Sequence, residues 1–184
     1  MLKAKQNNKG AILVLILLMT SAVISAGAIL LYTSTTNYKM KHINIRVKKA
    51  LYNAEGALNE AYAIAIEYIE SALEYAYDKG NFENSYLDFL FGNCEDMPNH
   101  VSLVDYLEDN SNYLVYNYGN IFIEAEIFHK LDYLQLDIVA VCVDDRIEKK
   151  VKMICHILIP EEESSYDSIN PEDLIYIYEW ILER

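Results

Sequence analysis

The first strong pattern along the chain is an apolar run from Ala11 to Leu31 that contains no charged residue. A helix of about 20 apolar residues spans the roughly 30 Å hydrocarbon core of a bilayer. The hydroxyl-bearing side chains in the run are Thr20, Ser21 and Ser25. Their hydroxyls can bond to carbonyls of the same helix, which makes them tolerable in lipid. The run therefore predicts a transmembrane segment over residues 11–31.

The pattern becomes periodic over residues 32–79, where apolar residues recur at helical spacing. Lys79-Gly80 is a suitable C-terminal stop. We expect one helix from about Ala11 to Tyr77, with its first third in the membrane and an amphipathic continuation. The stretch Thr33–Asn37 has low helix propensity and is expected to loosen the helix locally. The predicted apolar stripe consists of Leu51, Ala54, Leu58, Ala61, Ala65, Ile69, Ala72, Leu73 and Ala76.

Residues 121–159 instead alternate with a period of two, in three runs separated by turns at 130–132 and 144–146. This predicts a three-stranded antiparallel meander, with Tyr113–Tyr118 as a candidate fourth strand. A sheet this small needs a cover on one face, and the helix stripe is the available partner. The predicted inward sets are Ile121, Ile123, Ala125 and Ile127; Leu134, Leu136, Ile138, Ala140 and Cys142; and Val151, Met153, Cys155, Ile157 and Ile159.

The remaining segments complete an α+β domain. Within the extracytoplasmic region 80–160, Tyr86–Phe91 and Val101–Leu107 have the pattern of short helices. Residues 161–184 are predicted to be an acidic linker followed by a short C-terminal helix, Pro171–Leu182. Asn170 is a good cap for that helix, because proline and two acids follow it.

Charge is divided along the chain. Residues 1–50 contain eight Lys and Arg and no Asp or Glu. A basic leader, residues 1–10, favours a cytoplasmic N-terminus, whereas the basic residues of Lys39–Lys49 favour the opposite orientation. Because the leader is so short, we expect the N-terminus in the cytoplasm and the C-terminal domain outside it.

After residue 50 the chain carries 28 acidic residues against seven basic ones. Such a domain repels phosphate and disfavours binding of nucleic acid. Arg146–Lys152 is the one stretch that could form a local basic patch.

No catalytic residue, metal site or cofactor is predicted. The four histidines are scattered without ligand spacing, and no nucleophile or phosphate-loop motif occurs. Asp144-Asp145 fits a solvated hairpin turn better than a calcium loop. The three cysteines allow either one disulfide with a free thiol or three buried thiols. The histidines are His42, His100, His129 and His156, and the cysteines are Cys94, Cys142 and Cys155.

The order of these segments resembles type IV pilins and the pseudopilins of type II secretion systems. The similarity is greatest to minor pilins with a PilX-like N-terminus. It rests on Gly10-Ala11 before the apolar run, the basic stretch Lys39–Lys49 and the segment Ala54-Glu55-Gly56-Ala57-Leu58. It covers about the first third of the chain. It implies a pilin-like α+β fold, in which a long N-terminal helix packs on a small antiparallel sheet.

The resemblance also implies processing and partners. Prepilin peptidase would cleave between Gly10 and Ala11 on the cytoplasmic side and methylate the new N-terminus. The mature chain would associate with other pilins or pseudopilins, the inner-membrane assembly platform and membrane lipid, and reach a filament at the cell surface. Most pilins carry glutamate where this chain has Leu15. That departure favours a minor subunit that initiates or caps assembly.

Two plainer interpretations of the N-terminus stay open. It resembles a simple signal anchor, and Ala26-Gly27-Ala28 fits a signal-peptide cleavage site. Apolar residues continue beyond that site, which is unusual for a cleaved signal. The alternative function is a single-pass membrane protein whose extracytoplasmic domain binds a ligand or senses a signal.

Overall fold

The computed structural model describes residues 9–79, 81–111, 120–160 and 169–183. The chain divides into two compact units, unit 1 (Met1–Ile45) and unit 2 (Arg46–Arg184). Helix α1, Lys9–Lys79, contributes to both. It ends at the predicted stop, two residues later than expected.

Unit 1 is helical throughout its described residues, and nearly all of its side chains are exposed. The expected loosening at Thr33–Asn37 is wrong, since the helix is continuous there. The hydroxyls of Thr33 and Thr36 bond to the carbonyls of Ile29 and Tyr32, at 2.8 and 2.9 Å. These bonds reinforce the turn that low propensity was expected to weaken.

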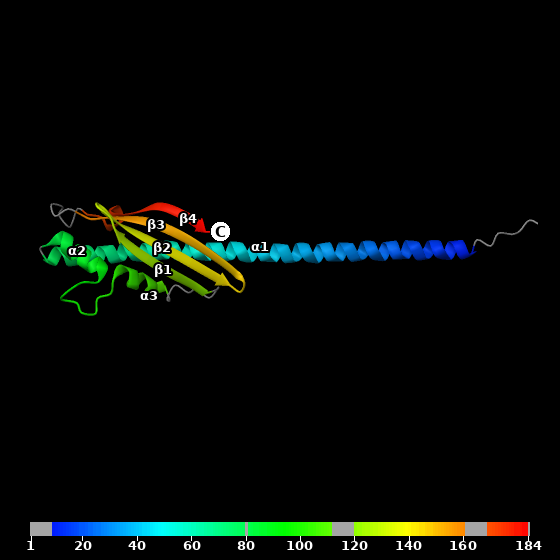
Figure 1. The fold of residues 1–184 in the computed structure, drawn as a ribbon, viewed down its shortest axis with the longest axis horizontal. Helices are drawn as coiled ribbons and strands as arrows, with labels where there is room; N and C mark the ends of the chain where they lie inside the picture. The colour runs from blue at the N-terminus through cyan, green and yellow to red at the C-terminus, as the bar shows by residue number, and fades with distance from the viewer. Residues whose placement is uncertain (1–8, 80, 112–119, 161–168, 184) are drawn as a thin grey trace, which may run out of the picture. The chain divides into compact units, whose positions relative to one another are not determined.

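Unit 2 contains a four-stranded antiparallel sheet in the order β1-β2-β3-β4. Its strands are β1 (Asn120–His129), β2 (Tyr133–Asp144), β3 (Ile147–Leu158) and β4 (Ile175–Glu183). The strands lie alongside the part of α1 that belongs to unit 2 (Figure 1). The predicted meander is confirmed as β1 to β3, with both turns where the sequence placed them.

The predicted alternation is also confirmed. One set of side chains from each strand is buried with the α1 stripe in a single hydrophobic core. Within the predicted sets, Leu51, Ile127 and Ile159 are half-buried and the other members are buried. The α1 stripe is mostly alanine, which lets the helix backbone lie close to the sheet.

Helices α2 (Phe82–Phe91) and α3 (Leu103–Ser111) confirm the two predicted short helices. Helix α2 begins four residues earlier than predicted, and α3 begins two residues later and ends four residues later. Gly92 ends α2 with φ +75° and donates its N–H to the Phe89 carbonyl. A Cβ at Gly92 would lie 2.9 Å from the Ser102 backbone nitrogen. The position therefore requires glycine on both conformational and steric grounds.

The predicted C-terminal helix Pro171–Leu182 is wrong. Asn170 does cap a helix, accepting from the Glu172 N–H at 3.3 Å, but this helix, α4, ends at Leu174. The chain continues as β4, which pairs with β3. The segment is rich in β-branched and aromatic residues, and strand pairing overrides the helix start signal.

Two other predictions, the candidate strand Tyr113–Tyr118 and the linker Glu161–Ser168, lie outside the described residues. All three cysteines are free and buried, so the structure favours three buried thiols over one disulfide with a free thiol.

Candidate functional site

The predicted processing residues lie at the start of α1. Gly10 and Ala11 are exposed and adjacent, and Leu15 follows one turn later on the same side of the helix as Ala11. A Cβ at Gly10 would meet no other atom within 4 Å. Both residues thus belong to the first turn of α1, the part of a helix that opens at little cost.

The rest of unit 1 presents apolar side chains outward. By length and composition α1 is suited to crossing a membrane, and none of its most apolar window is buried within the structure. A core helix of a soluble protein would be mostly buried. The hydroxyls of Thr20, Ser21 and Ser25 all bond to carbonyls of α1, at 2.9 to 3.0 Å. The surface from Ile12 to Leu31 is therefore apolar and satisfies its own polar groups.

A small hollow follows on the same unit. It is lined by Tyr38, Lys39, His42 and Ile43. The rings of Tyr38 and His42 lie 6.5 Å apart. Tyr32 precedes this group by fewer than two turns and is also exposed. After the apolar run the chain thus passes through Tyr32 and a short polar stretch, residues 33–37, to a group that contains aromatic and basic side chains.

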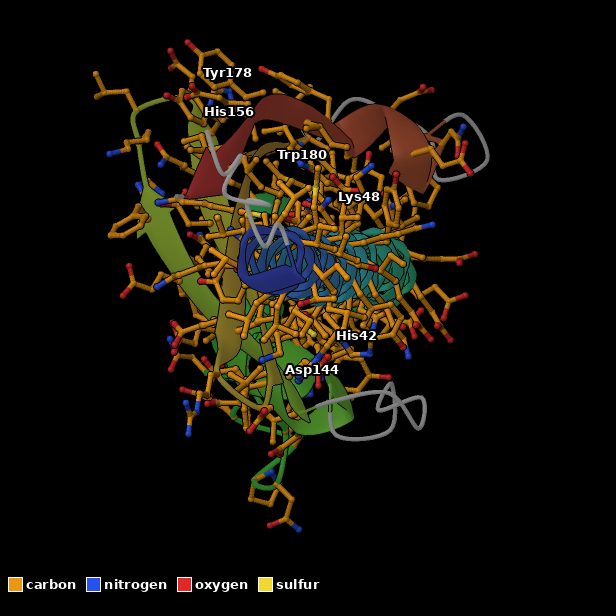
Figure 2. All side chains as sticks on the ribbon, turned by 90° about the vertical axis from the view of Figure 1, so that its right-hand side faces the viewer. His42, Lys48, Asp144, His156, Tyr178 and Trp180 are labelled. Atoms are coloured by element: carbon orange, nitrogen blue, oxygen red, sulfur yellow. The ribbon has the colours of Figure 1, made fainter. Side chains whose placement is uncertain are left out.

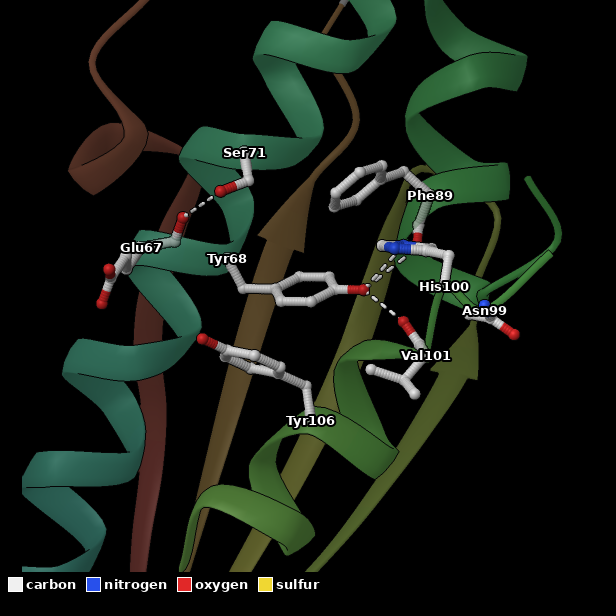
Figure 3. A pocket seen from close by; sticks show the side chains of 8 residues that line it. All are labelled: Glu67, Tyr68, Ser71, Phe89, Asn99, His100, Val101 and Tyr106. Atoms are coloured by element: carbon white, nitrogen blue, oxygen red, sulfur yellow. Dashed lines mark hydrogen bonds between the residues drawn. The ribbon is translucent and has the colours of Figure 1, made fainter. Parts of the chain in front are cut away.

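Unit 2 contains a cavity of ≈ 270 Å³ lined by residues of α1, α2, α3 and the segment before α3. In Figure 3 the Tyr68 hydroxyl points across it toward His100 and Val101. Tyr68 donates to the Val101 carbonyl at 2.5 Å, and His100 Nε2 lies 2.9 Å from both the Tyr68 hydroxyl and the Phe89 carbonyl. Because a carbonyl only accepts, Nε2 carries a proton.

These bonds give the Tyr68 cluster a structural role. Both of its polar side chains already bond to backbone carbonyls, and burial raises the pKa of Tyr68. The neutral phenol therefore stays a donor that fastens the segment around Val101 to α1. The cavity is also smaller than the roughly 300–1,000 Å³ of typical ligand sites.

A second link in unit 2 joins α1 to the β2–β3 turn. The Arg46 guanidinium donates to Asp144 Oδ1 and Oδ2 at 2.9 and 3.1 Å and to the Asp144 carbonyl at 3.0 Å. Hydrogen bonds to this carboxylate raise the pKa of Arg46. Asp145 adds a contact at 3.5 Å and has φ +58°. The pair therefore lies at the predicted hairpin, with Asp144 as the last residue of β2 and Asp145 in the turn, and Asp144 binds an arginine rather than only water.

The outer face of the sheet combines ion pairs with an aromatic cluster. Lys152 Nζ lies 2.6 Å from Asp137 Oδ2. The His156 ring stacks on Tyr178 at 4.4 Å and lies 4.2 Å from Tyr133. Figure 2 shows His156 and Tyr178 close together on one side of the sheet. The neighbours of His156 are rings, so it is a packed residue of the sheet.

Sequence reasoning missed the Tyr68–His100 and Arg46–Asp144 links. The second joins residues 98 positions apart, and no spacing pattern marks such a pair. Within the described ranges, no group of three or more His, Cys, Asp and Glu side chains could hold a metal ion.

The chain was also compared with known proteins. No protein family, curated protein or solved structure matches it. What the chain does must therefore be argued from its own residues and fold.

Proposed function

We propose that this chain is a minor pilin or pseudopilin-like structural subunit of a type IV pilus or type II secretion-type filament. Before assembly, residues 11–31 would lie in the inner membrane and unit 2 outside the cytoplasm. The observation that carries the proposal is the exposed apolar helix that begins at Lys9-Gly10-Ala11 and continues into the core helix of a small antiparallel sheet domain.

The surface of unit 1 supports this proposal. Its apolar side chains need an apolar partner, and both lipid tails and the helices of other subunits provide one. Small residues at Ala22, Ser25 and Ala26 allow a second helix to approach closely. One helix surface thus suits both the membrane and a helical filament core.

Leu15 supports a minor rather than a major role. A carboxylate in an apolar helix is costly unless it is paired. In a filament whose subunits pair such a carboxylate with a neighbour's N-terminal amine, a subunit with leucine there needs no preceding partner. We therefore place this chain at the start or tip of the assembly.

The deciding experiment is N-terminal sequencing and intact-mass analysis of the chain, co-expressed with a prepilin peptidase and extracted from membranes. We expect a mature chain that begins at Ala11 and carries one methyl group. Gly10→Val should block cleavage. Gly27→Ala is the matched control, because Gly27 also has open space around its Cβ position and lies beyond the junction.

Other results would reject the proposal in distinguishable ways. An uncleaved chain in cells with active peptidase would favour the membrane-anchored binding or sensing protein. A chain that begins at Ile29 would identify a cleaved signal peptide.

Leu15→Glu is a second test, because it restores the carboxylate that most pilins carry. We expect the variant to increase in copy number along sheared filaments or to reduce the number of filaments, measured by quantitative immunoblotting and electron microscopy. Leu17→Glu, which adds the same charge two residues later, is the control. Unchanged copy number and filament number for Leu15→Glu would contradict the assigned position.

A further inference from the structure

We propose that the segment Tyr32–Ile43 binds anionic phospholipid headgroups through Tyr32, Tyr38, Lys39, Lys41 and His42, hereafter the interfacial belt. This inference rests on the membrane placement given under the proposed function. It adds a ligand class, the phosphate of an anionic lipid, and names the side chains that attract it.

The belt begins within the headgroup layer at Tyr32 and continues beyond its outer edge. Leu31 ends the apolar run, and Lys39 lies about 12 Å further along the helix axis. Headgroups extend about 5–7 Å beyond each side of the hydrocarbon core. Side chains on a helix lean toward its N-terminus, here toward the apolar run, and lysine has a long flexible stem. The ammonium group of Lys39 can therefore reach back to the outer edge of the headgroup layer. Lys41, about 15 Å beyond Leu31, lies within about one Debye length of that edge and attracts the phosphates without touching them.

The distribution of charge around the helix also favours lipid over a protein surface as the partner of the belt. Lys39 and Lys41 are about 160° apart around the helix axis, and both are exposed. One protein surface would contact one side of a helix, whereas headgroups surround it. Tyr32 and Tyr38, both more than 70% exposed, are the residue type enriched where membrane meets water.

The hollow beside Tyr38 and His42 gives the belt a local binding geometry. Two of its lining residues, Lys39 and His42, carry nitrogen donors, and the other two, Tyr38 and Ile43, offer apolar surface. A phosphate with attached glycerol has the same combination of charge and apolar surface. The chemistry of the hollow is therefore complementary to a phospholipid headgroup.

The acidic residues of unit 2 oppose binding to an anionic membrane, so any attraction must come from basic residues near the apolar run. Residues 46–184 contain 28 acidic and ten basic residues, so unit 2 is repelled by an anionic surface. Arg46, the next basic residue after the belt, is bonded to Asp144 within unit 2. The lysines of the belt are thus the exposed cations nearest the apolar run on its C-terminal side.

The test uses the full chain in phosphatidylcholine vesicles that contain trace spin-labelled phosphatidylglycerol or phosphatidylcholine. Electron spin resonance measures how much of each labelled lipid is held at the protein. We expect about a fivefold preference for phosphatidylglycerol. The preference should nearly disappear in Lys39→Gln/Lys41→Gln, to a ratio near one, and it should weaken in 0.5 M salt. Lys130→Gln/Lys149→Gln removes the same charge from the β1–β2 turn and β3 of unit 2 and should keep the preference.

Each alternative outcome has a separate meaning. A preference that survives in Lys39→Gln/Lys41→Gln, or is absent from the unmodified chain, overturns the interfacial belt but leaves the proposed function standing. Loss of self-association by that variant in pure phosphatidylcholine, without any lipid preference, assigns the lysines to a protein partner and also overturns it. A chain that fails to enter the vesicles refutes the membrane placement itself.

Discussion

Tyr86 is the largest fully buried side chain among the described residues, and its hydroxyl has no hydrogen-bond partner within them. Burial also raises the pKa of Tyr86, which keeps the hydroxyl protonated. A buried hydroxyl without a partner costs about 1–3 kcal/mol relative to one in water. The ring of Tyr86 contributes to the core while its oxygen opposes folding.

Tyr86→Phe should therefore stabilise unit 2 by about 1 kcal/mol, because it removes the unbonded oxygen and keeps the ring. Urea unfolding of the full chain in detergent, followed by the fluorescence of the single tryptophan, Trp180, measures this change. Tyr62→Phe is the control and should destabilise, since the Tyr62 hydroxyl donates to the Ile175 carbonyl at 3.0 Å. A loss of stability in Tyr86→Phe would show that the hydroxyl has a partner.

The buried thiol of Cys155 makes the stability of unit 2 depend on pH. Burial raises the pKa of the Cys155 thiol from 9.0 to about 12. Above pH 9 the unfolded chain releases this proton while the folded chain keeps it. The thiol's contribution to stability is therefore complete below about pH 9 and is lost as the pH rises toward 12.

We expect the free energy of unfolding to fall with pH above 9, with Cys155 contributing up to about 1.4 kcal/mol per pH unit. Cys155→Ala should give a shallower dependence, whatever its stability at neutral pH. Urea titrations at pH 8, 9.5 and 10.5 in both proteins measure the two slopes. Equal slopes would contradict the assignment to this thiol.

The alanine stripe is the feature of α1 that matters most at the scale of an element. Ala61, Ala65 and Ala72 are at most 1% exposed, so the helix has no room for larger side chains against the sheet. Helix and sheet together form one core. Close approach by small residues is thus the basis of the packing in unit 2.

Ala65→Leu should destabilise unit 2 by about 1–3 kcal/mol, because a close-packed interior cannot accept three more carbons without strain. Ala63→Leu makes the same change two residues earlier on the exposed side of α1, and its effect should be within about 0.5 kcal/mol of zero. Thermal unfolding of both variants by circular dichroism gives the comparison. Similar losses in the two would argue against tight packing of this stripe.

Elements with a long, regular period were predictable from the sequence, and competing signals explain the error in β4. The stripe on α1 and the alternation in β1 to β3 repeat over many residues, so local exceptions do not hide them. At Pro171 the cap and first-turn signals are correct for four residues. The following Ile-Tyr-Ile-Tyr segment then pairs with β3, a long-range contact that no local signal contains.

The Arg46–Asp144 link could not be predicted because it, too, depends on a long-range contact. Arg46 reads as one of several basic residues after the apolar run, and Asp144 as a turn residue. Their bidentate bond depends on the distance between α1 and the β2–β3 turn, which follows from packing of the whole domain. The roles expected for Gly10, Ala11 and Leu15 rest on a local sequence motif and stay predictions.

At the scale of the molecule, the two units differ in what stabilises them. The buried core extends from Ala50 to Ile175 and lies within unit 2. Unit 1 has almost no buried side chain among its described residues. The acidic domain thus contains the hydrophobic core it needs to fold.

A fragment of residues 46–184 should therefore fold cooperatively in water without detergent, with a strong negative charge that keeps it soluble. Size-exclusion chromatography and a single urea transition followed by Trp180 fluorescence would check this. The full chain should require detergent under the same conditions. Aggregation of the fragment would show that unit 2 depends on residues 1–45.

The hydroxyls along α1 affect how easily the apolar run could move between lipid and a protein neighbour. Thr20, Ser21 and Ser25 bond to the backbone of their own helix, so their hydrogen bonds do not depend on what lies outside it. Transfer of the apolar run from one apolar environment to another would break none of these hydrogen bonds. If the proposed function holds, the free-energy difference between lipid and a protein neighbour around this helix would come from packing and lipid entropy, not from these hydroxyls.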